Sequence, residues 1–132
     1  MARYRIGKTF KFDAAHRLDG LPDGHKCGNL HGHTYEVTLH LEADDVDAVG
    51  FVVDYGDLAP VKRWVDGSLD HAYLNDVLGF NPTAERLAEH VYSRWKSAYP
   101  ALAAVTVKET GSTYAEYRPG PRVIGHVPFE VP

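Results

Sequence analysis

The chain has 132 residues, of which 44% are hydrophobic and 24% charged, and its formal net charge at pH 7 is −4. This length suits one domain with its own core, and the mildly acidic balance argues against general attraction to nucleic acid or anionic membranes. With one cysteine and no long apolar run, neither a disulfide framework, a signal peptide nor a membrane span is expected, so we expect a cytoplasmic protein.

The first part of the chain has the pattern of two strands joined by a loop. In "YRIGKTFKFDAAH" the alternate residues from Phe10 to His16 share one parity, which predicts a strand. The following "GLPDGHKCGN" is rich in Gly, Pro, Asp and Asn, as is typical of a loop. In "HTYEVTLHLEA" apolar residues from Tyr35 to Leu41 alternate with polar ones, and this stretch is the clearest strand of the chain.

Two helices are predicted next. The first has Asp54 or Asp57 near its start, and the second has Thr83 as its N-cap and Pro100 as its stop. Each has a stripe of apolar residues at helical spacing, Leu58, Val61, Val65 and Leu69 in the first and Leu87, Val91, Trp95 and Ala98 in the second.

The segments "LAAVTVKET" and "STYAEYR" predict two closing strands. The order strand, strand, helix, helix, strand, strand indicates an α+β domain, with a largely antiparallel sheet and its helices on one face. We assign residues 1–118 to this domain and residues 119–132, which carry several prolines, to a C-terminal extension along the surface or against a neighbour.

Histidines are unusually frequent, at eight in the chain. His31 and His33 extend the inward row of the second strand, about 7 Å apart by backbone rise, so their rings can converge on one metal ion. His16 ends the matching row of the first strand and is the best third ligand. Three neutral imidazoles with an open position are typical of catalytic zinc. The alternative is that these histidines are structural or solvent-exposed residues without a metal, as we expect for His40, His90 and His126.

Cys27 lies in the glycine-rich loop, four residues before His31. The positive neighbour Lys26 and a bound metal would favour a reactive thiolate, whereas a fourth metal ligand would close the site. Asp70 and His71 are adjacent and form an acid/base pair if they lie next to the thiol, or merely follow the helix.

Glu109 ends the inward apolar row of the first closing strand, where a carboxylate needs a partner. Either an arginine supplies it, or the glutamate binds a ligand with adjacent N–H donors, such as the ring edge of a pterin or guanine.

Six sequence blocks together resemble the 6-pyruvoyltetrahydropterin synthase superfamily. In chain order they are "FDAAHRL", "CGNLHGHTYEV", "VVDYGDL", "LDHAYLND", "NPTAERLA" and "VKETGSTYAEY", and they span about residues 9–117. The preceding "GHKC" and the short step from Cys27 to the HGH segment are most similar to the bacterial 6-carboxytetrahydropterin synthases of the queuosine and 7-deazapurine pathway.

The resemblance implies the tunnelling fold (T-fold), in which subunits join their sheets into a barrel and pair as a hexamer, a dimer of trimers, with active sites between subunits. It implies a role for eight residues: His16, His31 and His33 as zinc ligands, Cys27, Asp70 and His71 as catalytic residues, and Glu109 with Thr110 as the pterin site.

The implied reaction converts 7,8-dihydroneopterin triphosphate to 6-carboxytetrahydropterin, acetaldehyde and triphosphate. Lys26, Lys108 and Arg17 are candidates for the triphosphate site. The alternatives are pyruvoyl formation or another pterin side-chain cleavage, a non-catalytic zinc- or pterin-binding module, and a structural oligomer-forming domain.

Overall fold

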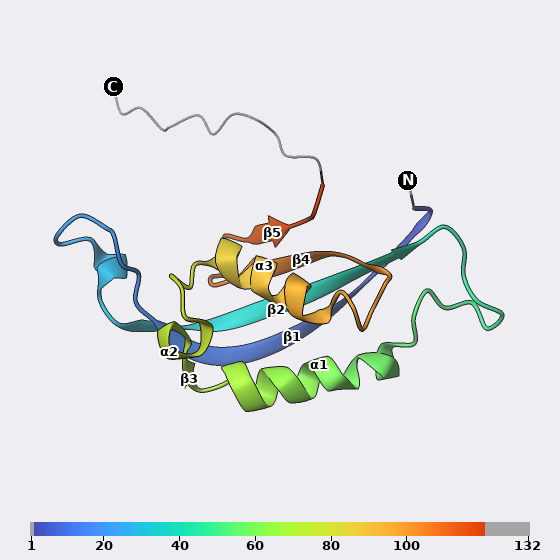
Figure 1. The fold of residues 1–132 in the computed structure, drawn as a ribbon, viewed down its shortest axis with the longest axis horizontal. Helices are drawn as coiled ribbons and strands as arrows, with labels where there is room; N and C mark the ends of the chain where they lie inside the picture. The colour runs from blue at the N-terminus through green and yellow to red at the C-terminus, as the bar shows by residue number, and fades with distance from the viewer. Residues whose placement is uncertain (1, 121–132) are drawn as a thin grey trace, which may run out of the picture.

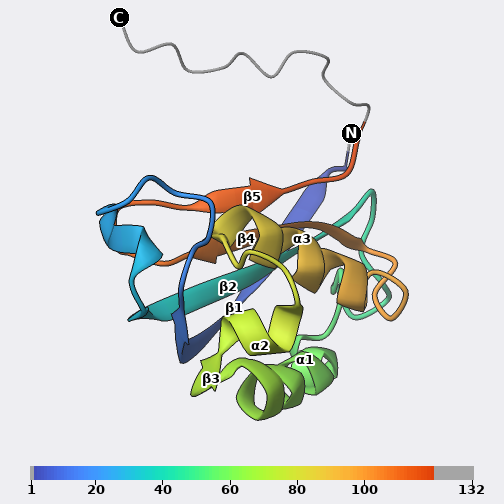
Figure 2. The same cartoon turned by 60° about the vertical axis from the view of Figure 1, so that its left-hand side comes forward.

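Residues 2–120 are described by the computed structural model, and they form a single sheet covered on one face by helices (Figure 1). The strands are β1 (Tyr4–His16), β2 (His31–Ala43), β3 (Ala72–Tyr73), β4 (Leu102–Lys108) and β5 (Ala115–Tyr117), in the spatial order β3-β1-β2-β4-β5. The helices are α1 (Ala59–Trp64), α2 (Leu74–Leu78) and α3 (Ala84–Trp95). In both ribbon views α1 and α3 run across the same face of the sheet (Figure 1, Figure 2). The predicted α+β architecture is therefore confirmed.

The long hairpin of β1 and β2 determines where the histidines of the two strands lie. The two strands pair antiparallel along their whole length, with Tyr4 opposite Ala43 and His16 opposite His31. The inward residues from Phe10 of β1 and from Tyr35 to Leu41 of β2 are buried, and the rings of Phe12 and Tyr35 stack at 5.0 Å between centroids. Because the inward row of each strand ends in histidine, the register places these histidines side by side at one end of the sheet.

The first predicted helix is shorter than its apolar stripe suggested. Asp54 accepts the N–H of Gly56 at 2.9 Å and caps a 3-10 turn, Tyr55–Leu58, that leads into α1; the four stripe residues are all buried. However, α1 ends at Trp64 and continues as a π-helical turn, Val65–Leu69. The stripe remains buried because the wider turn keeps Leu69 against the core.

The second predicted helix, α3, begins as expected. The Thr83 hydroxyl accepts the N–H of Arg86 at 3.2 Å, and Leu87, Val91 and Trp95 are buried. The prediction for Ala98 was wrong: it lies beyond the end of α3 and is exposed.

Two short elements between the helices were not predicted. β3 pairs parallel with Ala14 and Ala15 of β1, so the sheet is mixed, and α2 follows it directly. Gly79 ends α2 in the left-handed conformation, with φ 66°, which glycine adopts without steric cost.

The other face of the sheet is open and polar. On it Arg5 and Arg118 each contact both Glu42 and Glu116, with N–O separations from 3.1 to 3.9 Å. Within residues 2–120, β1 has no partner strand on its outer edge between Tyr4 and Asp13.

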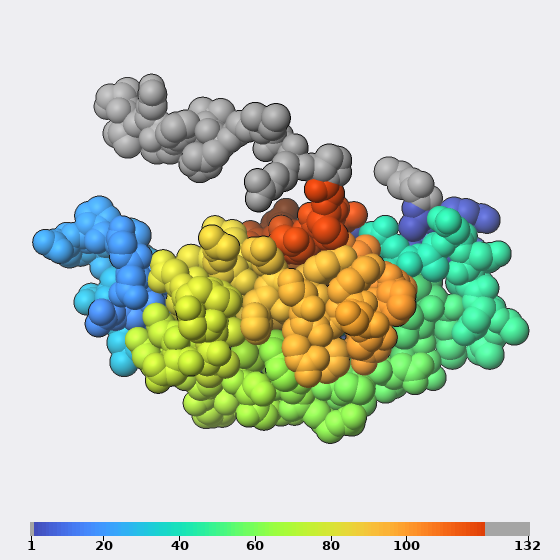
Figure 3. Space-filling model, in the orientation of Figure 1, coloured from blue at the N-terminus to red at the C-terminus, as the bar shows by residue number. Residues whose placement is uncertain are grey.

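The loop between β1 and β2 stands out from one end of the molecule (Figure 3). No helix within residues 2–120 combines the length and the apolar character that a membrane span requires. Of the predicted extension, only Pro119 and Gly120 are among the described residues, and His126 lies outside them.

Candidate functional site

The structure brings His16, His31 and His33 together at the end of the hairpin. One nitrogen from each ring lies within 4.8 Å of the others, and the ring centroids are 4.5–5.0 Å apart. The strand register explains the cluster, because His16 faces His31 directly while the small Ala14 faces His33 and leaves space for its ring. The predicted convergence of three imidazoles is thus present.

The hydrogen bonds of two of these rings leave their Nε2 atoms free to bind a cation. The Nδ1 of His16 lies 2.9 Å from the Pro82 carbonyl and 3.1 Å from the Tyr35 hydroxyl, and the Nδ1 of His31 lies 2.7 Å from the Asn29 carbonyl. Because a carbonyl only accepts, each Nδ1 carries the hydrogen, and each Nε2 presents a lone pair. These two Nε2 atoms lie 2.9 Å apart. Facing lone pairs at that distance need a proton or a cation between them, so the residues fit a metal ion.

His33 completes the group next to a carboxylate. Its Nε2 lies 3.8 Å from Glu109 Oε2. Burial lowers the pKa of His33, and the neighbouring His16 and His31 lower it further, while Glu109 opposes them. The lowered pKa favours the neutral imidazole, which is the form that binds metal.

Glu109 directly follows the last residue of β4, and its carboxylate lies near the inward ring of His33, as its parity predicted. Among the described residues no arginine pairs with it, and its side chain remains 24% exposed. It lines a depression together with Thr110, whose hydroxyl hydrogen-bonds to Thr113 at 2.7 Å. The carboxylate can therefore receive N–H groups from a ligand.

Cys27 lies in a 3-10 turn, Lys26–Gly28, at the end of the long loop. The ring of His25 accepts the N–H of Cys27 at 3.1 Å, and the carbonyl of Cys27 accepts the N–H of Leu18 at 3.0 Å. Its sulfur belongs to neither of the two groups of potential metal ligands found among the described residues. The structure therefore does not support Cys27 as a fourth ligand.

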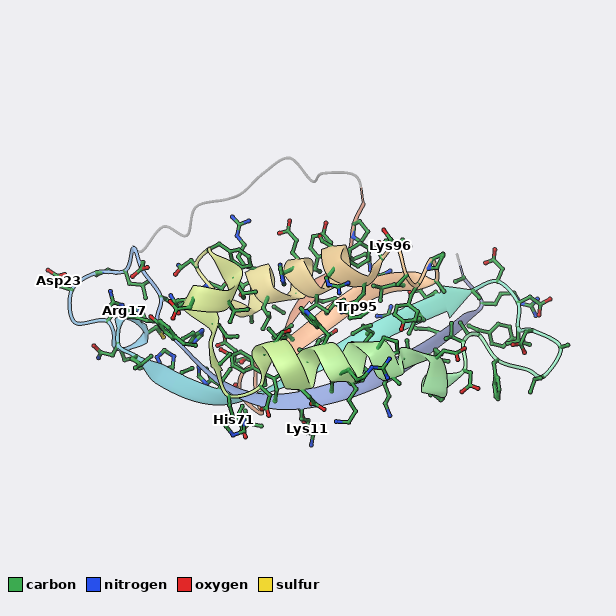
Figure 4. All side chains as sticks on the ribbon, turned by 60° about the horizontal axis from the view of Figure 1, so that its bottom comes forward. Lys11, Arg17, Asp23, His71, Trp95 and Lys96 are labelled. Atoms are coloured by element: carbon green, nitrogen blue, oxygen red, sulfur yellow. The ribbon has the colours of Figure 1, made fainter. Side chains whose placement is uncertain are left out.

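Two asparagines hold the start of this loop against α2 and the segment after it. The side chain of Asn75 bonds both the N–H and the carbonyl of Arg17, at 2.8 and 2.6 Å. Asn81 does the same for Asp19, at 2.9 and 3.1 Å. Because Leu18 between them bonds to Cys27, the two amides also position the thiol. Figure 4 shows Arg17 and Asp23 in this loop.

Asp70 and His71 form a second cluster with Asp13 of β1. The Asp70 carboxylate accepts the N–H of Asp13 at 3.0 Å and lies 2.9 Å from His71 Nδ1. The Asp13 N–H and the His71 ring lower the pKa of Asp70, whose carboxylate in turn raises the pKa of His71. These two residues therefore form an ion pair over a wider pH range than free side chains would.

An open depression of about 460 Å³ extends from the second cluster to one imidazole of the first, since Asp13, His71 and His33 all line it. Its volume lies within the usual range for a small-molecule site. However, the three metal-binding candidates occupy the helix-covered rows, whereas Asp13 lies on the open face. Within one chain the sheet therefore separates most of the first cluster from the second.

Sequence reasoning missed the groups that orient these side chains. The carbonyls of Asn29 and Pro82 carry no sequence signal, because any residue has a carbonyl. Asp13 could have been found only from the strand register, which places it opposite Thr34. Arg17, Lys26 and Lys108 remain predictions for a triphosphate site; Arg17 lies 3.5 Å from Asp19.

A family model described as 6-pyruvoyl tetrahydropterin synthase matches residues 5–120. The chain belongs to this family. Similar proteins named 6-carboxy-5,6,7,8-tetrahydropterin synthase include one from Synechocystis, 37% identical over 85% of this chain and 91% of its own length. Another, from Bacillus subtilis, is 32% identical over 88% of this chain and 86% of its own length. The resemblance inferred from the six sequence blocks is thus confirmed.

Solved structures of the family have the same fold. The 6-pyruvoyl tetrahydropterin synthase of Caenorhabditis elegans superposes with a TM-score of 0.77 at 28% identity, covering 89% of this chain and 96% of its own. The Plasmodium falciparum protein, at 18% identity and a TM-score of 0.63, covers 89% and 98% and supports the fold alone. The predicted T-fold is confirmed.

Proposed function

We propose that the protein is a zinc-dependent lyase that converts 7,8-dihydroneopterin triphosphate and one water to 6-carboxytetrahydropterin, acetaldehyde and triphosphate. The observation that carries this proposal is the group of three imidazoles whose free nitrogens converge beside an open depression. The names of the relatives support the carboxy product. The product would enter queuosine and 7-deazapurine synthesis, and the protein would work in the cytoplasm.

In this proposal each cluster has a separate task. His16, His31 and His33 hold zinc, which when bound would act as a Lewis acid toward oxygens of the substrate side chain. The Cys27 thiolate removes a proton from a side-chain carbon, and His71, paired with Asp70, returns a proton elsewhere. One water is consumed when the side chain is cleaved. No redox cofactor is needed, because the reduction of the pterin ring is matched by oxidation of side-chain carbon in the same substrate.

We further propose that the active sites lie between subunits of a hexamer built as a dimer of trimers. Two features support this arrangement. The Asp70–His71 pair and most of the metal group lie on different sides of the sheet, so another copy can supply what one chain separates. The outer edge of β1 from Tyr4 to Phe12 also has no partner strand within residues 2–120, so a second chain can pair with its backbone groups. Sedimentation of the purified protein tests the assembly.

Product analysis tests the proposed reaction. Incubation of the zinc-loaded protein with 7,8-dihydroneopterin triphosphate should give 6-carboxytetrahydropterin and equal amounts of acetaldehyde and triphosphate, identified by mass spectrometry. Formation of 6-pyruvoyltetrahydropterin, or cleavage without triphosphate release, would replace this assignment with the corresponding pterin reaction. Binding of substrate without any product would indicate a non-catalytic pterin-binding module.

Glu109→Gln should weaken pterin binding while leaving the metal in place. The amide keeps the shape of the carboxylate but loses its charge and offers one acceptor oxygen, so a two-point contact with ring N–H groups is lost. A charged hydrogen-bond pair of this kind contributes about 1.5–3 kcal/mol, so KM should rise about 10- to 100-fold. Steady-state kinetics and zinc analysis measure both effects. Glu89→Gln, on the exposed side of α3, is the matched control, and equal KM values in the two variants would contradict the assignment.

A further inference from the structure

Asp13 connects three elements at one point of the open face. Its N–H donates to the Asp70 carboxylate at 3.0 Å, and its carbonyl accepts the N–H of His71 at 2.6 Å. Its own carboxylate accepts the hydroxyl hydrogen of Thr34 on β2 at 2.6 Å. The proposed function gives roles to Asp70 and His71 but none to the Asp13 carboxylate.

The main chain of Asp13 fixes the position of the imidazole. His71 has φ 58° and is the one non-glycine residue with positive φ among the described residues. This conformation costs a non-glycine residue energy, so neighbouring contacts must hold it. Here the contact is the hydrogen bond to the Asp13 carbonyl. The Asp70 carboxylate then orients the ring, since it binds Asp13 N–H with one oxygen and His71 Nδ1 with the other.

The side chain of Asp13 adds a second negative charge next to the ring. Oxygens of Asp13 and Asp70 and a nitrogen of His71 all lie within 4.8 Å of one another. Both carboxylates raise the pKa of His71, Asp70 most strongly. Lys11, the preceding open-face residue of β1, pairs with Glu36 at 3.4 Å. Figure 4 shows His71 and Lys11 projecting from the same side of the molecule.

We propose that Asp13 is a positioning residue for the Asp70–His71 pair: its carboxylate, oriented by Thr34, keeps His71 as an imidazolium that delivers a proton. The catalytic part of this statement rests on the proposed function. The effect of Asp13 on the protonation of His71 does not, because it depends only on the arrangement of the three side chains.

The test is the titration of His71 by NMR in Asp13→Asn, with the His71 signal assigned by its disappearance in His71→Gln. Asparagine keeps the backbone contacts and an oxygen that accepts from Thr34, but removes the charge. The His71 midpoint should fall by about 0.5 pH unit, the size expected for one charge about 5 Å away near a wet surface. Glu89→Gln should leave it unchanged, and Asp13→Glu should restore part of the shift.

Thr34→Val is a second variant, which keeps the Asp13 charge but removes the hydroxyl that orients it. It should lower the His71 midpoint by less than Asp13→Asn does. A His71 midpoint that is the same in wild type, Asp13→Asn and Thr34→Val would overturn the proposal. If the wild type is active, its kcat should decrease at high pH as His71 loses its proton. In Asp13→Asn this decrease should occur at lower pH, in step with the NMR midpoint. A decrease at the same pH in both proteins would overturn the proton-delivery role. A shifted midpoint in a wild type without lyase activity would support the positioning role and refute the proposed function separately.

Discussion

Cys27→Ala is expected to abolish turnover and to leave the metal bound. In the proposed reaction the thiolate removes the proton that starts the rearrangement, and alanine offers no group to replace it. Loss of a general base typically costs a factor of 10²–10⁴, so kcat should fall by about 10³-fold or more. Acetaldehyde and triphosphate release measure the rate, and atomic spectrometry of the purified variant measures zinc content.

The metal content of this variant decides between two roles for the sulfur. If Cys27 closed the metal site as a fourth ligand, its removal would release zinc as well as activity. The structure favours the open site, because the sulfur lies outside the group formed by the three imidazoles. Cys27→Ser is the matched control: it should keep both fold and zinc and still turn over slowly, since a hydroxyl is a much weaker base. Zinc loss in Cys27→Ala, or full activity in either variant, would contradict the assignment.

The long hairpin was predictable because its residues alternate strictly. One buried face imposes a period of two, and a shift of one residue would place Tyr35 and Leu39 in water. Both are fully buried in the structure. The same argument places His31 and His33 on the inward row. The alternation in β1 and β2 therefore predicts the central hairpin of the fold and the three histidines of the candidate metal site.

The segment from Val65 to Leu78 was less predictable, because tertiary contacts decide its conformation. The π-helical turn is closed by the Asp70 N–H donating to the Val65 carbonyl at 2.9 Å. The next residue, His71, is held by Asp13, which lies far away in the sequence. Local propensity contains neither contact, so the pattern of apolar residues predicted a longer α-helix and missed β3 and α2.

The orientation of the site residues depends on backbone groups, which have no sequence signature. Parity predicts that two imidazoles share a face, but the carbonyls of Asn29 and Pro82 determine which nitrogen of each ring is free. The asparagine contacts to the Cys27 loop are similar, because Asn75 and Asn81 bind main-chain atoms rather than side chains. Composition and spacing indicate which residues form the site, and the loops determine how they point.

His31→Ala is expected to remove the bound metal and, with it, both activity and metal-dependent stability. Two imidazoles would remain, and the free nitrogen of His16 would lose the partner that faces it at 2.9 Å. We expect zinc affinity to fall more than 100-fold. A ligand at 100 times its Kd stabilises the native state by about 2.7 kcal/mol. Zinc should therefore raise the Tm of the wild type by roughly 10 °C and leave that of His31→Ala unchanged.

The stabilisation of the protein by zinc should decrease as the pH falls. Zinc binds neutral imidazoles, so protons compete with it as the pH falls. Because burial lowers the pKa of His33 below its ordinary value of 6.5, this ring stays neutral at pH 7 and competes only in more acid solution. The zinc-dependent rise in Tm should thus be full near neutral pH and vanish as the pH falls well below 6.5. His40→Gln, which can keep the hydrogen bond to Thr106 on the open face, is the control and should behave as the wild type. Stoichiometric zinc in His31→Ala, or zinc loss in His40→Gln, would show that the ion binds elsewhere and would remove the basis for the proposed chemistry.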